Sequence, residues 1–198
     1  MADPTDATLA TYERGAETYC AASPQTVAPA VAALLDALVE AVPGGRVLEL
    51  GSGPGREAAY LERSGMTVDR TDATPAFVDR LQRAGHAARL LDVRSGELGG
   101  PFDAVLANAV LLHLDRTDME QALRSCLAAT RPGGLLALTL KEGDGEGWSD
   151  AKLDAPRWFV YWRPQHLREV LERTGWRVLR LEQVEGRDEP WLHALCRR

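Results

Sequence analysis

Short apolar runs alternate with segments of helical periodicity over most of this chain. Between the apolar runs, apolar positions recur every three or four residues, as on one face of a helix. Strands separated by helices form a parallel sheet with helices on both faces. The pattern therefore predicts an α/β fold, with strands over residues 46–50, 67–71, 87–91, 102–107, 135–140, 176–184 and 191–196 and helices over 27–42, 57–63, 74–84, 118–130 and 164–174.

Three segments depart from this alternation. The connection between the last two predicted strands, residues 185–190, is too short for a crossover helix but long enough for a hairpin. The last strand is therefore expected to run antiparallel. Residues 1–11 are expected to fray, and residues 11–22 to form a short helix with Tyr12 and Tyr19 on one face. Residues 141–157 hold three glycines and no periodicity, which predicts a loop.

The stretch Val47-Leu48-Glu49-Leu50-Gly51-Ser52-Gly53-Pro54-Gly55-Arg56 is the centre of the predicted site. A strand ending in alternate glycines brings bare backbone close to a ligand, and the helix after it directs free N–H groups to the same place. A dinucleotide fingerprint needs a glycine where Arg56 stands, and no Gly-Lys-Ser/Thr follows for a phosphate-binding loop.

Two acids extend this site. Asp72 ends the second strand at the interval where a carboxylate reaches the two hydroxyls of a ribose. Asp92 ends the third strand and is placed to take an exocyclic amine of adenine, with Val93 against the ring. Each acid has an alternative interpretation, Asp72 as an acid at a helix N-terminus and Asp92 as an ordinary turn residue.

Together these residues resemble the class I S-adenosylmethionine-dependent methyltransferases. The likeness runs from about residue 30 to the end of the chain. It rests on the glycine stretch, Asp72-Ala73-Thr74-Pro75, Leu91-Asp92-Val93, Phe102-Asp103-Ala104-Val105, Leu112-His113-Leu114 and Arg131-Pro132-Gly133-Gly134-Leu135. It implies one Rossmann-like domain over residues 1–198, a three-layer sandwich whose seven strands lie in the order 3-2-1-4-5-7-6 with strand 7 antiparallel. Residues 1–25 would form an N-terminal lid, residues 30–198 the core, and residues 141–157 a substrate loop.

The resemblance also implies roles for single residues. Residues 49–55 would hold the methionine end of the cofactor, Asp72 the ribose, and Asp92 and Val93 the adenine. Ala73 is smaller than the usual aliphatic residue at its position. The implied cofactor site consists of Tyr12, Tyr19, Glu49, Gly51, Ser52, Gly53, Gly55, Arg56, Asp72, Ala73, Asp92, Val93, Asn108 and Ala109.

Candidates for the substrate side are fewer. His113 is the only histidine near the expected methyl-transfer point, and a base of near-neutral pKa suits an oxygen or nitrogen acceptor; packing beside two leucines is the alternative. The aromatic residues Trp148 and Tyr161 are candidates for contact with a flat substrate, although the cluster around them equally suits a seal over the last helix.

Composition narrows the class of protein. A net charge of −6 argues against a broad nucleic-acid surface. Three cysteines without paired spacing indicate a reducing compartment, and the four histidines lack the spacing of a metal site. With no long apolar run and no basic-then-apolar leader, we expect a cytoplasmic protein without membrane or nucleic-acid partners, as a monomer or homodimer.

The sequence therefore predicts a methyltransferase that moves the sulfonium methyl of S-adenosylmethionine by direct displacement to an oxygen, nitrogen or carbon of a small molecule, aromatic compounds and secondary metabolites included. Such an enzyme mainly aligns the reactants and excludes water. Methylation of RNA or of a protein, and a silent cofactor-binding partner of another enzyme, are the alternatives. A nicotinamide oxidoreductase is disfavoured by Arg56.

Overall fold

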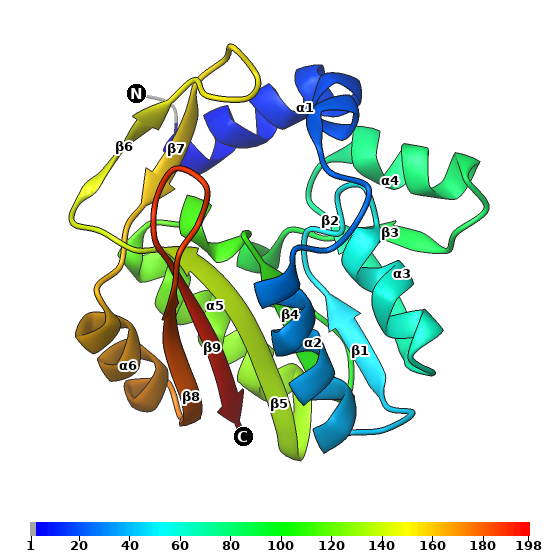
Figure 1. The fold of residues 1–198 in the computed structure, drawn as a ribbon, viewed down its shortest axis with the longest axis vertical. Helices are drawn as coiled ribbons and strands as arrows, with labels where there is room; N and C mark the ends of the chain where they lie inside the picture. The colour runs from blue at the N-terminus through cyan, green and yellow to red at the C-terminus, as the bar shows by residue number, and fades with distance from the viewer. Residues whose placement is uncertain (1–2) are drawn as a thin grey trace.

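A computed structural model describes residues 3–198 as a sheet covered by helices on both faces (Figure 1). Its elements are α1 (Pro4–Ala22), α2 (Pro29–Ala41), β1 (Arg46–Glu49), α3 (Arg56–Arg63), β2 (Thr67–Asp72), α4 (Pro75–Arg83), β3 (Ala88–Leu90), the 3-10 turn η1 (Val93–Ser95), β4 (Phe102–Asn108), the 3-10 turn η2 (Leu111–His113), α5 (Arg116–Ala129), β5 (Thr130–Lys141), β6 (Glu146–Ser149), β7 (Arg157–Val160), α6 (Pro164–Arg173), β8 (Arg177–Val184) and β9 (Trp191–Arg197).

The central sheet confirms the expected architecture. Its seven strands lie in the order β3-β2-β1-β4-β5-β9-β8, which is the predicted order 3-2-1-4-5-7-6 once β9 and β8 are counted as strands 7 and 6. β1 pairs in parallel with both β2 and β4, whereas β9 pairs antiparallel with β5 and β8. The short connection before β9 therefore makes the hairpin that its length predicted.

Two apolar cores hold the layers together. One contains Leu34, Leu35 and Leu38 of α2 and Leu61 of α3, packed on one face of the sheet. The other packs α5 and α6 on the opposite face, with Met119 and Leu167 fully buried. These helices meet the sheet because their apolar residues recur at the spacing that keeps them on one side.

The N-terminal helix is longer than expected, and the prediction that residues 1–11 fray is wrong for its described part, from residue 3 onward. Asp3 caps α1 by accepting a hydrogen bond from the Thr5 N–H (2.8 Å), and Pro4 occupies the first turn, where its missing N–H is not needed. Thr8 and Thr11 are buried, and both use their hydroxyls in hydrogen bonds to the segment 156–158. Residues 1 and 2 lie outside the described part of the chain.

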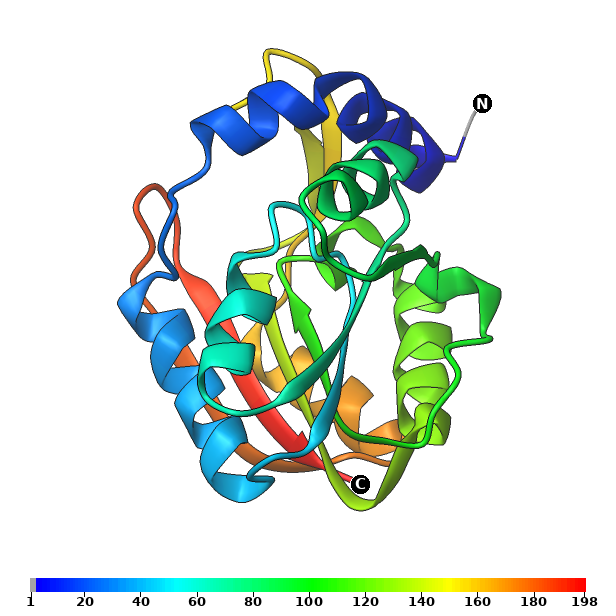
Figure 2. The ribbon, with the colours of Figure 1, turned by 90° about the vertical axis from the view of Figure 1, so that its right-hand side faces the viewer.

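The segment expected to be a loop contains a strand. β6 pairs antiparallel with β7, from Glu146 opposite Val160 to Ser149 opposite Arg157, as a two-stranded sheet apart from the central one. α1 packs beside this hairpin and beside α4, across the end of the sheet where β1 and β4 terminate (Figures 1 and 2). The hairpin was missed because β7 begins only at the last residue of the 141–157 segment and the glycines of that segment conceal the alternation.

Candidate active site

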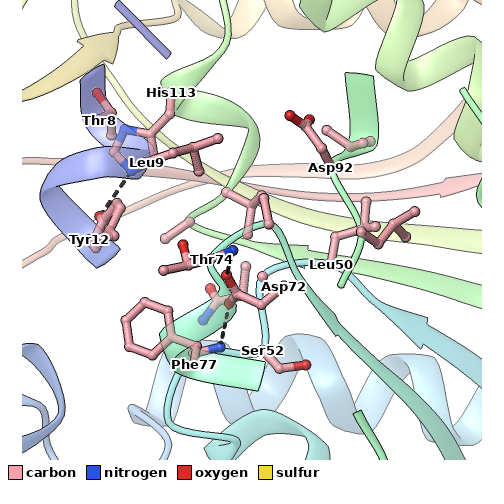
Figure 3. A pocket seen from close by; sticks show the side chains of 18 of the residues that line it. Thr8, Leu9, Tyr12, Leu50, Ser52, Asp72, Thr74, Phe77, Asp92 and His113 are labelled. Atoms are coloured by element: carbon pink, nitrogen blue, oxygen red, sulfur yellow. Dashed lines mark hydrogen bonds between the residues drawn. The ribbon is translucent and has the colours of Figure 1, made fainter. Parts of the chain in front are cut away.

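A cavity of about 940 Å³, its open mouth included, lies between the carboxyl ends of β1, β2 and β4 and the overlying helix α1. The position suits a small-molecule site, because it is the point where an α/β sheet reverses its strand order. Figure 3 shows side chains from α1, from the glycine loop and from the ends of β2, β3 and β4 around it.

The glycine loop forms one wall of this cavity. Gly51 has φ +63°, and a Cβ built on it would lie 2.5 Å from Cγ2 of Val110. Both the backbone conformation and the lack of space therefore require glycine at this position. Gly53 (φ +48°) donates its N–H to Asp72 at 2.9 Å. Ala109, which also borders the cavity, has φ +56°, which is strained for a residue with a side chain, and its N–H donates to the Thr139 hydroxyl (2.9 Å).

Asp72 is the most firmly fixed acid at the cavity. Its two carboxylate oxygens accept hydrogen bonds from the Gly53 and Thr74 N–H groups, both at 2.9 Å (Figure 3). Burial raises the pKa of this carboxyl, and the backbone hydrogen bonds oppose that effect. Each oxygen keeps a further lone pair, so the carboxylate can still accept from a pair of hydroxyls.

Asp92 borders the same cavity but is already paired. The Arg94 side chain binds both of its oxygens, the shortest contact being 2.6 Å, and also binds Asp6 at 2.7 Å and Asp3 at 3.3 Å on α1. Burial alone would raise the pKa of Asp92, but the hydrogen bonds and charge of Arg94 outweigh burial and lower it. Asp92 thus links the sheet end to α1 through Arg94.

A row of four residues on one face of α1 borders the cavity: Thr5, Thr8, Tyr12 and Tyr19. The row is held by aromatic contacts, with the Tyr12 and Tyr19 rings 5.4 Å apart and both close to Phe77 of α4. Burial raises the pKa of both tyrosines, so both keep their protons at neutral pH.

His113 borders the cavity from the end of η2. Its Nδ1 is 2.6 Å from the carbonyl oxygen of Trp158. Its Nε2 is 3.0 Å from the Tyr12 hydroxyl (Figure 3). Burial lowers the pKa of His113 to about 4, partly offset by the Trp158 hydrogen bond and reinforced by the positive charges of Arg157 and Lys141. Both ring nitrogens are therefore engaged, and neither is open to an acceptor as an unassisted base.

The cavity brings together most of the residues expected from the sequence. Those that border it are Tyr12, Tyr19, Gly51, Ser52, Gly53, Arg56, Asp72, Ala73, Asp92, Val93, Asn108, Ala109 and His113.

The remaining expected residues lie elsewhere. Glu49 is buried beneath the loop, 2% exposed, and accepts a hydrogen bond from the Ser52 hydroxyl at 2.5 Å. Gly55 (φ +82°) starts α3 without reaching the cavity. Trp148 is 51% exposed and packs edge-on against Trp158, outside the cavity, and Tyr161 also lies outside it. Glu49 and Gly55 therefore support the loop, and the two aromatic residues give no wall to this cavity.

Further cavity residues were not expected from the sequence. The stripe on α1 had a signal, because Thr5, Thr8, Tyr12 and Tyr19 are spaced as one helical face. The others depend on contacts between distant segments. The residues added by the structure are Thr5, Thr8, Leu9, Glu57, Thr74, Phe77, Leu91, Val110 and Leu114.

Neither a metal-binding cluster nor a membrane-spanning helix is found among the described residues. Across residues 3–198, no group of three or more histidine, cysteine or acidic side chains is arranged to hold a metal ion. None of the helices in that range is both long and apolar enough to pass through a membrane.

Known proteins share both the sequence pattern and the fold. Residues 23–181 match the family model described as "Methyltransferase domain". The ubiquinone biosynthesis O-methyltransferase of Methylocella silvestris is 36% identical over 101 residues, 47% of this chain and 38% of that protein. The protein-L-isoaspartate O-methyltransferase of Methanoregula boonei is 28% identical over 67% of this chain and 66% of that protein. The chain thus spans less than two thirds of the length of these relatives.

Two of the similar solved structures align over the whole of this chain. The magnesium protoporphyrin IX methyltransferase of Synechocystis PCC 6803, with bound SAM, has a TM-score of 0.78 at 16% identity and is covered over 98% of its length. The 1,6-didemethyltoxoflavin-N1-methyltransferase of Burkholderia thailandensis, with bound substrate and S-adenosylhomocysteine, has a TM-score of 0.75 at 21% identity and is covered over 91%. The family match extends over well more than half of the sequence, from α2 to β8, and this chain therefore belongs to the methyltransferase domain family.

Proposed function

We propose that this protein is an S-adenosylmethionine-dependent methyltransferase that acts on a small molecule through an oxygen, nitrogen or carbon atom. The observation that carries the proposal is the Asp72 carboxylate, which is fixed by two backbone N–H groups at the end of β2 and borders a cavity beside the glycine loop. This arrangement supports recognition of a ribose next to a group that needs close backbone contact.

The cavity lining fits the proposed cofactor in three parts. Asp72 suits the ribose hydroxyls, and the apolar Leu91, Val93 and Phe77 suit the flat adenine. The glycine loop and Arg56 suit the methionine end, because Arg56 is a cation at the N-terminus of α3. When bound, this cofactor would supply an electrophilic methyl group on a sulfonium.

The chain itself would then bind, align and exclude water. α1 covers the cavity and is tied down by Glu17 to Arg80 (2.7 Å) and by the Glu13 carboxylate, which accepts from the Ala76 N–H (2.9 Å). Exclusion of water strengthens the polar contacts inside the site and holds the reactants in line. We propose α1 as the lid, with the hairpin β6–β7 behind it.

The same covering helix favours a small acceptor over RNA or protein. A macromolecule would need α1 displaced from its contacts with α4 and β7, and the net charge of −6 gives no general attraction for RNA. The names of the two similar solved structures specify small molecules, 1,6-didemethyltoxoflavin and magnesium protoporphyrin IX, and this supports the same class of acceptor here.

The proposal extends to the compartment. Cys20, Cys126 and Cys196 are all buried free thiols, which supports a reducing environment such as the cytoplasm.

Calorimetric titration with S-adenosylhomocysteine tests the cofactor assignment. We expect binding by the wild type, and at least about 100-fold weaker binding by Asp72→Ala, because two hydrogen bonds to a charged group contribute about 1.5–3 kcal/mol each. Asp79→Ala removes an exposed acid on α4 and serves as the matched control, expected to bind as the wild type does. Wild-type protein that fails to bind, or an Asp72→Ala variant that binds equally well, contradicts the proposal.

A transfer assay tests the acceptor class. The protein is incubated with methyl-labelled S-adenosylmethionine and extracts of its source, and the extract is then separated into small molecules, RNA and protein. Label is expected in the small-molecule fraction. Label confined to RNA or protein would show that the acceptor class is wrong, while absence of transfer with intact cofactor binding would favour a silent binding partner.

A further inference from the structure

The hydrogen bonds of His113 determine which of its nitrogens carries the proton. The Trp158 carbonyl can only accept, so Nδ1 (2.6 Å away) must be protonated. A neutral ring then leaves Nε2 as an acceptor, and the Tyr12 hydroxyl 3.0 Å away donates to it. Burial keeps the ring neutral by lowering the pKa of His113 to about 4, and the charges of Arg157 and Lys141 add to this effect. His113 thus waits as a proton acceptor that only Tyr12 can reach.

Arg157 completes the arrangement from the other side of the Tyr12 oxygen. This side chain is 6% exposed, and its Nη1 donates to the Tyr12 hydroxyl at 3.2 Å. Its Nη2 donates to the Ala151 carbonyl and its Nε has no partner. No carboxylate of the described chain forms an ion pair with it. A buried cation without a counterion is costly, which indicates that negative charge develops nearby.

The Tyr12 oxygen therefore has one lone pair left for a further hydrogen bond. Its proton points to His113 and one lone pair accepts from Arg157, so the second lone pair is free for a group in the cavity that Tyr12 borders. Asp72 also faces Tyr12 across the cavity, and its charge favours a proton on the tyrosine. This free lone pair attracts a methyl-accepting substrate that still carries a hydrogen on its reacting atom, and it repels a substrate that arrives as an anion.

We propose that Tyr12 takes the proton of the methyl acceptor while its own proton passes to Nε2 of His113, with Arg157 as the positioning residue that stabilises the oxygen during the exchange. This inference rests on the proposed function and narrows its substrate class to hydroxyl or N–H acceptors.

The step balances in atoms and charge. The acceptor atom gains the methyl group and loses its hydrogen to the Tyr12 oxygen, and the electron pair of the broken carbon–sulfur bond stays on sulfur. The positive charge lost from the sulfonium appears on the His113 ring. The site therefore keeps its total charge, which limits the electrostatic cost of ionising a buried histidine. The proton returns through Tyr12 to solvent when the products leave.

Nitrogen NMR of protein labelled with ¹⁵N-histidine tests the resting state of this relay without any turnover. We expect His113 to carry its proton on Nδ1, with Nε2 bare, at pH 7 and down to about pH 5.5, both alone and with S-adenosylhomocysteine. In Tyr12→Phe the Nε2 resonance should move, because it loses its donor, while Nδ1 stays protonated. Tyr60→Phe is the control, since it removes a tyrosine hydroxyl that donates to Asp36 far from the cavity.

An Nε2-protonated or doubly protonated His113 at pH 7 would overturn the relay, because no site would remain for the Tyr12 proton. This result is independent of cofactor binding, so it leaves the proposed function standing. Failure to bind S-adenosylhomocysteine with the expected His113 state would instead remove the proposed function.

Kinetics with the acceptor found in the transfer assay supply the second test. Tyr12→Phe and His113→Asn should each lower kcat by at least about 100-fold with little change in the KM for the cofactor. Arg157→Lys should retain more activity than Arg157→Met, because the cation next to Tyr12 matters more than the shape of the guanidinium. An acceptor without a transferable hydrogen, or a Tyr12→Phe variant with wild-type kcat, would refute the proposal.

Discussion

Glu49 offers a direct test of how the glycine loop is supported, through the substitution Glu49→Gln. The side chain is 2% exposed beneath the loop. Burial raises the pKa of its carboxyl from 4.5 to about 7; the Ser52 hydrogen bond opposes this rise, and the nearby charge of Glu57 adds to it. Arg70, the cation that would favour ionisation, is held by Glu62 through two hydrogen bonds of 2.5 and 2.7 Å.

The sign of the pH effect follows from the raised pKa. In the unfolded chain Glu49 loses its proton near its ordinary pKa of 4.5, whereas in the folded protein it does so only near 7. Its stabilising contribution is therefore full below pH 4.5 and is lost as the pH rises to about 7. At 1.4 kcal/mol per pH unit the loss amounts to about 3 kcal/mol.

Glutamine removes this dependence because it cannot ionise. Its amide cannot accept both the Ser52 hydroxyl and the backbone N–H of Ala58, which costs about 1 kcal/mol at every pH. The informative quantity is thus the difference in the free energy of unfolding between variant and wild type, which should rise by about 3 kcal/mol in favour of the variant from pH 4.5 to pH 8.

Urea unfolding at half-unit steps of pH measures this difference. Glu40→Gln changes an exposed acid on α2 and should show a flat difference across the same range. A flat difference for Glu49→Gln as well would refute the reasoning, because it would mean that Glu49 ionises in the folded protein as easily as in the unfolded chain.

Three further predictions concern the loop, the covering helix and the hairpin. Gly51→Ala places a Cβ 2.5 Å from Val110 and should lower Tm by at least about 4 °C, whereas Gly44→Ala, also at positive φ but in open space, should cost less by calorimetry; equal losses would contradict the clash. Arg94→Gln removes the ion pairs with Asp3 and Asp6, whose loss of roughly 1 kcal/mol should speed amide hydrogen exchange in α1 about fivefold. Unchanged exchange would show that these ion pairs do not hold the helix in place. Trp148→Ala should leave S-adenosylhomocysteine affinity unchanged and shift stability by less than about 0.5 kcal/mol, so weakened binding would place Trp148 in the site.

The sheet could be predicted because its signals are local. Each strand is a short apolar run and each covering helix shows its own periodicity, so residues such as Val47 and Leu61 indicate their environment through their neighbours in sequence. Strand order then followed from the resemblance, and the antiparallel last strand from the length of a single connection. The position of Asp72 was predictable for the same reason, since it depends only on where β2 ends.

What the sequence concealed depends on pairs far apart in the chain. Asp92 looks unpaired in the sequence, yet Arg94 forms ion pairs with both Asp92 and Asp6, and Asp6 lies 86 residues before Asp92 in the chain. The state of His113 depends on the Trp158 carbonyl and on Tyr12, neither of which is near it in sequence. Arg157 gave no signal at all, because burial without a counterion is visible only once the hairpin β6–β7 is placed beside α1.

The attachment of α1 has a consequence for turnover. The helix that shields the cavity is joined to its far side by exposed charge pairs, Glu17 with Arg80 and both Asp3 and Asp6 with Arg94. Such pairs weaken as ionic strength rises, whereas the tyrosine and phenylalanine contacts beneath them do not. If α1 acts as the lid proposed above, added salt should hasten product release while leaving the methyl-transfer step unchanged. The rate at which α1 opens over the cavity would then increase with the salt concentration.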